Sequence, residues 1–224
     1  MSDKLANAFA ASPTAFFALV GVLALILFAL YTRRIRFTTH LTVQVALAVA
    51  MTTLLNFVRI YHFPQGGSVT SGAMVPLILL AMRYGVGVGM LGGFLYSLIN
   101  FFQDPFVLHP VQVLFDYPLP MMAMGLAGLF GSRMWLSVTL AFGGRFLCHF
   151  ISGLVFFASF APEGTSPILY SLTVNGSMML GEWLICCLIL KFLPVQRLLS
   201  FAMREDNSSN FPHQKYCSPK YHKR

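Results

Sequence analysis

The sequence predicts an all-α integral membrane protein. Of its 224 residues, 57% are hydrophobic and only 10% are charged, whereas a soluble domain carries about a quarter charged residues. Seven apolar runs follow one another along the chain, and basic residues stand beside several of them. Apolar runs with basic flanks are typical of helices that cross a bilayer repeatedly, so we expect a multi-pass protein of the plasma membrane.

The formal charge of +8 indicates topology rather than a nucleic-acid partner. Lys and Arg number 15 against 7 Asp and Glu, but no basic face alternates with aromatic residues as a nucleic-acid surface would. The basic residues instead follow apolar runs, as RRIR (33–36) follows the first one. Such residues mark cytoplasmic helix ends, and no nucleic-acid partner is expected.

The first run, residues 15–31, predicts a membrane anchor that precedes the other helices. No small-residue cleavage site follows it, and its basic flank resists translocation, so it differs from a signal peptide. With its flanks, it is just long enough to cross ~30 Å of hydrocarbon. We expect an external N-terminus and a cytoplasmic linker that ends near residue 40.

Six further helices are predicted to alternate across the membrane. External loops between them hold Asp104 and Glu163 and no Lys or Arg, while Arg59, near an external helix end, fits this topology least well. The predicted organisation is an anchor with its linker (1–40), a membrane domain (41–193) and a basic cytoplasmic tail (194–224). The predicted helices are 41–61, 74–85, 85–102, 111–130, 134–160 and 169–192.

Asp116, in VQVLFDYPLP (111–120), is the most unusual residue of these runs. It lies about five residues, or roughly 8 Å, below the external end of its helix, and a charge at the bilayer centre costs about 2.5–3.5 kcal/mol. Gln112 shares its face, and Pro118 and Pro120 free backbone carbonyls that a protein or a cavity must satisfy. Asp116 is either a structural partner of Arg145 or part of a ligand site.

The next helix carries Arg145, His149, Gly153 and Phe157 at four-residue spacing, which puts them on one face. A flat ring could lie against Gly153 and Phe157 while His149 hydrogen-bonds to its edge. The structural alternative is a buried histidine bonded to a backbone carbonyl, with Gly153 serving helix packing.

Polar residues also enter the last helix. Tyr170 and Ser171 stand at its external mouth and Asn175 lies one turn deeper, which suits a polar ligand. Glu182 is two turns deeper again, and we expect it to be a structural partner of Arg145 or Arg133.

Small residues recur at four-residue spacing in two helices, at Gly85, Gly89 and Gly93 and at Ala46 and Ala50. Such faces let helices approach closely. Both could pack within the chain or against a partner helix.

Catalytic and metal-binding motifs are missing from the sequence. There is no GxxxxGK[ST], HExxH or GxSxG, so ATP hydrolysis and the hydrolase chemistries of these motifs are not expected. The cysteines Cys148, Cys186, Cys187 and Cys217 form no CxxC pair and have no histidine at metal-ligand spacing. We expect no enzyme, no metal and no cofactor.

Five strings resemble one known family. GGSVTSGAMVPLILLAMRYG, VQVLFDYPLP, GLAGLF, RFLCHFISG and YSLTVNGS are similar to the thiamine-specific substrate-binding (S) subunit of energy-coupling factor (ECF) transporters, from about residue 41 to 193. The resemblance implies a six-helix bundle with an external pocket that is closed by the loop at 62–72. The run at 15–31 would then be one extra N-terminal transmembrane helix.

The resemblance also implies a ligand, a site and partners. The thiazolium ring of thiamine is a permanent cation, which explains an ionised carboxylate nearby, and its two flat rings suit aromatic faces and polar edges. The implied partners are the lipid bilayer, a transmembrane coupling subunit that docks at Ala46 and Ala50, and two ATPases. The implied binding residues are Asp116, Tyr117, His149, Gly153, Phe157, Tyr170 and Asn175.

The chain departs from the family pattern at several points. The extra helix and the basic tail are additions, and Phe157 stands where members can use tryptophan, while the closing loop offers Gly66 and Gly67. Phenylalanine stacks on a cation less well than tryptophan, so affinity or specificity could differ.

Three alternatives stay open. The first is the same fold with another vitamin or a thiamine precursor, such as riboflavin or hydroxymethylpyrimidine, although a neutral ligand gives no reason to bury Asp116. The second is a membrane enzyme or sensor that uses His149 and Asp116 as an acid–base pair. The third is an assembly subunit, in which Asp116, His149 and Asn175 could become apolar without loss of activity.

Overall fold

The computed structural model describes residues 13–33, 35–63, 67–130 and 133–195. Five of its helices are long and apolar enough to cross a membrane: α2, α3, α5, α8 and α9. The elements in chain order are α2 (Pro13–Thr32), α3 (Thr39–Asn56), β1 (Arg59–His62), β2 (Ser68–Thr70), α4 (Val75–Tyr84), α5 (Val86–Gln103), α6 (Pro110–Asp116), α7 (Pro118–Ala123), η1 (Met124–Gly128), α8 (Met134–Phe156), η2 (Ala158–Phe160) and α9 (Pro167–Phe192).

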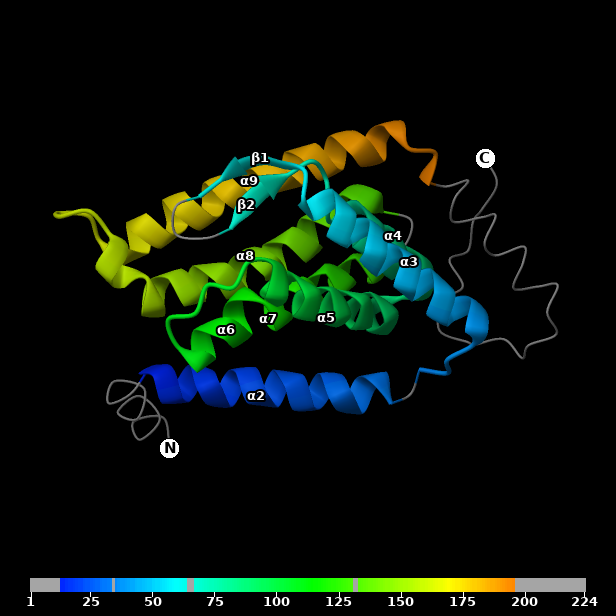
Figure 1. Cartoon of the computed structure of the whole chain (residues 1–224), viewed down its shortest axis with the longest axis horizontal. Coiled ribbons are helices and arrows are strands. Elements are labelled where there is room, and N and C mark those ends of the chain that lie inside the picture. Colours follow the sequence, from blue (N-terminus) through cyan, green and yellow to red (C-terminus); the bar gives the residue numbers. More distant parts are fainter. Residues whose placement is uncertain (1–12, 34, 64–66, 131–132, 196–224) are drawn as a thin grey trace.

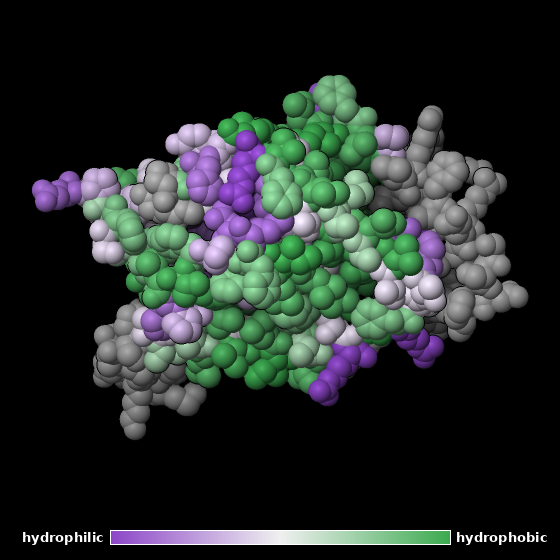
Figure 2. Space-filling view, viewed as in Figure 1, coloured by the Kyte–Doolittle hydropathy of each residue, from purple (hydrophilic) through white to green (hydrophobic). Residues whose placement is uncertain are grey.

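The helices form one elongated bundle, and the fold is α-helical apart from a short hairpin, as predicted for an all-α protein (Figure 1). The extra helix α2 lies along one side of the bundle beside α5 and α6, and α9 runs along the opposite side. An apolar band crosses the middle of the face in Figure 2, and hydrophilic residues gather over the hairpin and toward the ends of the molecule. This distribution matches a protein whose waist is in lipid and whose ends are in water.

Local sequence signals set several helix ends. The Thr38 hydroxyl accepts the N–H of Leu41 at the start of α3, and the Ser166 hydroxyl accepts that of Leu169 at the start of α9. Such side chains satisfy backbone donors that the first helical turn leaves unpaired. Gly85 separates α4 from α5 with a φ of +88°, a conformation that glycine adopts without steric cost.

The helix predicted at 41–61 ends five residues early, at Asn56. Residues 59–62 instead form β1, which pairs antiparallel with β2. The residues from Val58 to Phe63 are partly or fully exposed, whereas Thr70 at the end of β2 is buried. The loop expected at 62–72 is therefore largely a short hairpin; residues 64–66 lie outside the described part of the chain.

The core is centred on α4, where Leu77, Ile78 and Ala81 have no exposed surface. This helix has only ten residues, about 15 Å, which is half the hydrocarbon thickness. The span predicted at 74–85 is thus a short buried helix. The segment between β2 and this helix is also largely buried.

The helix predicted at 111–130 is broken into α6, α7 and η1. The break falls at Tyr117, whose φ of −114° and ψ of −77° depart from the helix. Pro118 causes it, because proline has no N–H and restricts the residue before it. Pro118 then opens α7 at a first helical position, where proline is favoured.

Glycines hold the broken helix against α5. A Cβ on Gly93 would lie 2.0 Å from the carbonyl oxygen of Met121 in α7, and one on Gly89 would lie 2.8 Å from the Cα of Gly125 in η1. These two glycines therefore serve packing inside the chain, one of the two interpretations left open. Ala46 and Ala50 are exposed on α3.

Candidate ligand-binding site

A cavity opens between the hairpin, the broken helix, the C-terminal half of α8 and the N-terminal part of α9. It collects residues from segments that are far apart in the sequence, including Arg59 of β1, Tyr96 of α5 and Met178 of α9. All seven residues of the implied binding set line it: Asp116, Tyr117, His149, Gly153, Phe157, Tyr170 and Asn175.

Asp116 and Gln112 project from one face of α6 into this cavity. The amide of Gln112 donates to one carboxylate oxygen of Asp116, and the Nδ1 of His149 lies 3.3 Å from the other. A proton on Nδ1 would satisfy the carboxylate and leave Nε2 as an acceptor. Nε2 is buried and has no hydrogen-bond partner among the described residues, so it is available to a ligand.

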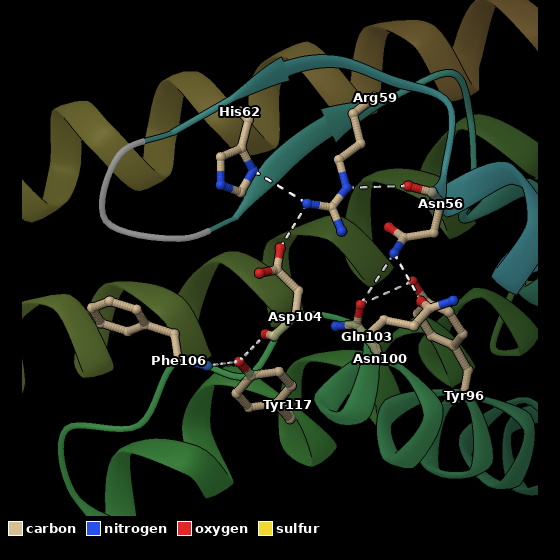
Figure 3. Close-up of polar contacts among 9 residues, drawn as sticks. All are labelled: Asn56, Arg59, His62, Tyr96, Asn100, Gln103, Asp104, Phe106 and Tyr117. Atoms are coloured by element: carbon tan, nitrogen blue, oxygen red, sulfur yellow. Dashed lines mark hydrogen bonds and ion pairs between the residues drawn. The ribbon is translucent and has the colours of Figure 1, made fainter.

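The helix break places Tyr117 under the loop that follows α5 (Figure 3). Its hydroxyl donates to the carbonyl of Asp104 at 2.7 Å and accepts the N–H of Phe106 at 2.8 Å. Gln112 binds the same loop, through the carbonyl of Phe106 and the N–H of Leu108. The short helix and the loop are thereby fixed to each other at the edge of the cavity.

The deep end of the cavity holds a buried ion pair between Arg145 and Glu182. Glu182 was expected to be a structural partner of an arginine, and the structure pairs it with Arg145 rather than Arg133. Asp116 does not pair with Arg145, so the structural interpretation of Asp116 is not supported. Glu182 also accepts from the hydroxyl and the N–H of Thr70, at 2.8 and 3.3 Å.

Gly153 lets α9 come close to α8. A Cβ there would lie 2.3 Å from the Ser171 hydroxyl and 2.7 Å from the Asn175 amide nitrogen. The Ser171 hydroxyl donates to the carbonyl of Phe150 and accepts from Asn175. The Tyr170 hydroxyl is buried and unpartnered within the described chain, which leaves it free to bond to a ligand.

The sequence did not reveal a second polar group in the cavity, which Figure 3 displays around Arg59. Its guanidinium contacts Asp104 at 2.7 Å, the Nδ1 of His62 at 3.4 Å and the carbonyl of Asn56 at 3.4 Å. The Asn56 amide donates in turn to Asn100. The poor fit of Arg59 to the predicted topology was the available signal.

Phe106 was missed as well, because no sequence signal distinguishes it within the loop that follows α5. Its ring is nearly parallel to that of Phe157, with centroids 5.7 Å apart and an interplanar angle of 20°. Both rings line the cavity. Phe157 therefore lines the cavity together with a second, stacked phenylalanine.

Arginines neutralise two of the three carboxylates that line the cavity. Three carboxylates (Asp104, Asp116 and Glu182) and two guanidinium groups (Arg59 and Arg145) line it. Each guanidinium pairs with one carboxylate, Arg59 with Asp104 and Arg145 with Glu182. Within the described part of the chain, Asp116 pairs with no arginine and contacts Gln112 and His149, so it is the carboxylate that a cationic ligand would meet.

A profile of the family described as "Thiamine transporter protein (Thia_YuaJ)" matches residues 42–202, a range that includes every residue of the cavity. The chain belongs to this family. The match begins within α3, so α2 precedes the part of the chain that is similar to the thiamine transporter family. The family is one of transporters and not of enzymes.

Individual relatives agree with this assignment. Thiamine transporter ThiT of Bacillus subtilis (strain 168) is 37% identical over 178 residues, which cover 70% of this chain and 92% of the relative. Thiamine transporter ThiT of Lacticaseibacillus paracasei (strain ATCC 334) is 32% identical over 127 residues, 48% of this chain and 63% of that protein. The solved structure of ThiT from Listeria monocytogenes superposes with a TM-score of 0.63 at 21% identity, over 73% of this chain and 95% of that one. This likeness shows the shared membrane fold.

Proposed function

We propose that this protein is the thiamine-binding subunit of an ATP-driven ECF vitamin uptake transporter. Membership of the thiamine transporter family supports thiamine as the ligand. The observation that carries the proposal is the charge of Asp116, the one cavity carboxylate that no arginine neutralises. The thiazolium ring supplies the missing positive charge, and opposite charges within ~4–6 Å favour the ionised carboxylate.

The rest of the cavity suits the rest of the ligand. The aminopyrimidine ring presents donors and acceptors at its edge, for which the Nε2 of His149 and the Tyr170 hydroxyl are available. The amide of Asn175, which donates to Ser171, also lines the cavity. Phe106 and Phe157 supply aromatic faces for a cationic ring. Tyr117 fixes the loop at 104–106 through its hydroxyl. Gly153 allows α8 and α9 to pack closely.

The proposed transport cycle needs partners. The chain has no P-loop motif, so two ATPase subunits and a transmembrane coupling subunit supply the energy. Ala46 and Ala50 are exposed on α3 and serve as the docking face, since small residues let helices approach closely in lipid. The N-terminus and the cavity face the outside, and the tail from residue 194 faces the cytoplasm; residues 196–224 lie outside the described chain.

The test compares a cation with its neutral isostere. The purified full chain is titrated calorimetrically with thiamine, with an analogue whose thiazolium is replaced by a neutral thiophene, and with riboflavin. We expect one-to-one binding of thiamine without ATP or partner subunits, and no heat with riboflavin. Riboflavin binding in place of thiamine would keep the fold and refute the substrate.

Variants then isolate the charge. Asp116→Asn should weaken thiamine binding by about a hundredfold or more, since breaking a buried charge pair costs about 3–5 kcal/mol, and should leave the neutral analogue nearly unaffected. Glu163→Gln, an exposed carboxylate of the α8–α9 connection, is the matched control and should change neither affinity. Thiamine affinity that stays within about threefold in Asp116→Asn contradicts the charge pairing.

A further inference from the structure

The extra helix α2 is docked on the bundle along a single stripe. Few residues of α2 are buried, and those that face away from the bundle are exposed. The less exposed residues recur every three or four positions along the helix. That is the spacing of one face of a helix packed against a partner. The stripe consists of Thr14, Phe17, Ala18, Gly21, Ala24, Leu25, Phe28 and Thr32.

The stripe makes close contacts at both ends. Near the cytoplasmic end, the ring of Phe28 lies 5.4 Å from that of Phe94 on α5, and a Cβ on Gly87 would lie 2.7 Å from the ring of Tyr31. Near the external end, the rings of Phe17 and Phe115 on α6 meet edge to face at 5.8 Å. The helix is therefore a fixed part of the bundle.

α2 also approaches α6 at Gly21, which is buried. A Cβ there would lie 3.3 Å from Leu114 and 3.5 Å from Phe115. Leu114 is two positions before Asp116, about 200° around the helix, whereas Gln112 and Asp116 share a face. Thus α2 presses on the back of α6, and the front of α6 carries the cavity carboxylate.

The short helix α6 depends on such support. It has seven residues and ends at the break beside Pro118, and a helix of this length has little stability of its own. On its cavity side it is fixed by Gln112 and Tyr117. Without α2, lipid would cover the opposite side and would not fix its position.

We infer that α2 is a positioning element for Asp116: it approaches α6 through Gly21 and fixes the depth of the carboxylate in the cavity. The inference rests on the proposed binding of a cationic ligand. It predicts that widening the α2–α6 contact weakens binding of the cation more than binding of its neutral isostere.

The test inserts a side chain at this contact. Gly21→Leu should weaken thiamine binding by about tenfold, since a binding group displaced by 1 Å loses most of its effect, and should weaken the neutral analogue by much less. The added volume should be relieved by Leu114→Ala in the same chain. Ala29→Leu, an exposed alanine of the same helix, is the matched control.

A second measurement does not depend on thiamine. Hydrogen exchange of the backbone amides of α6 reports how firmly the helix is held. The Val113 N–H donates to the carbonyl of His109, and the Tyr117 N–H donates to that of Val113. Exchange should accelerate in Gly21→Leu, recover with Leu114→Ala and stay unchanged in Ala29→Leu. If the wild-type protein does not bind thiamine, the proposed function fails. The exchange rates still test whether α2 holds α6 in place.

The outcomes separate the possibilities. Unchanged exchange and unchanged affinity in Gly21→Leu overturn the inference. Equal losses for thiamine and its neutral analogue also overturn it, because α2 would then maintain the cavity in general and not the carboxylate. Where Gly21→Leu does not fold, Phe17→Leu weakens the same contact more gently, and the same two measurements decide.

Discussion

Thr70 on β2 donates both its hydroxyl and its backbone N–H to one carboxylate oxygen of Glu182 on α9, while the other oxygen binds Arg145. Thr70 and Glu182 are 2% and 1% exposed, so water does not compete for these bonds. The hairpin at the edge of the cavity is thereby fastened to the buried end of the same cavity. Its second strand cannot move without breaking a buried charged network.

Glu182→Ala should be severely destabilising. It leaves the Arg145 guanidinium buried without its carboxylate, which lowers the free energy of unfolding by about 3–5 kcal/mol. Chemical unfolding of the purified protein measures the loss, with Glu163→Ala as the exposed control. A loss below about 1 kcal/mol would mean that water or another acceptor replaces Glu182.

Phe106 should contribute to thiamine affinity through its ring. Phe106→Leu keeps apolar volume but removes the aromatic face, and a cation–π contact is worth about 0.5–2 kcal/mol, or roughly 2–30-fold in affinity. Phe160→Leu is the control, since Phe160 contacts the same Phe157 ring but does not line the cavity. Calorimetry should separate the two variants; tighter binding in Phe106→Leu would mean that this ring competes with the ligand.

Arg59 should affect ligand release more than stability. Its pair with Asp104 is partly exposed, with 27% and 40% of the two side chains accessible, and such pairs contribute at most about 1 kcal/mol. However, it joins β1 to the loop at the cavity edge, so Arg59→Gln should accelerate thiamine dissociation in stopped-flow experiments. High salt should accelerate release from the wild type and not from the variant. A dissociation rate that changes neither with Arg59→Gln nor with high salt would exclude a role for this ion pair.

Ala46→Leu and Ala50→Leu should separate binding from transport. Both side chains are exposed on α3, so added volume should disturb the proposed partner helix and not the chain itself. Thiamine titration should match the wild type, while thiamine uptake by cells that carry the other subunits should be lost. Ala29→Leu on α2 is the control and should transport normally. Normal uptake in both docking variants would place the interface elsewhere.

The membrane class and the candidate residues were predictable because their signals are local. Apolar runs predict membrane spans from residues close in sequence, and the four-residue spacing from Arg145 to Phe157 puts its members on one face. All four residues of this face line the cavity. The strings that resemble a known family then supplied the ligand.

What was missed depends on contacts between distant segments. The sequence left Asp116 and Glu182 as two candidates for Arg145, and only the packing of α8 on α9 decides for Glu182. The hairpin was hidden because Phe57, Val58, Ile60 and Tyr61 extend the apolar run beyond Asn56, so hydropathy extended the helix to Tyr61. The pair of Arg59 with Asp104 joins residues 45 apart, and no local pattern predicts it.

The ion pair of Arg145 and Glu182 has a consequence for how the chain is made. The two residues lie on consecutive helices, 37 positions apart, so a ribosome delivers the arginine to the membrane first. A lone arginine within a bilayer is costly, about 2.5–3.5 kcal/mol even on insertion scales. α8 on its own is therefore a poor candidate for release into lipid, and biogenesis should favour the entry of α8 and α9 as a hairpin pair. A nascent chain that stops before Glu182 would carry Arg145 without the carboxylate that compensates its charge.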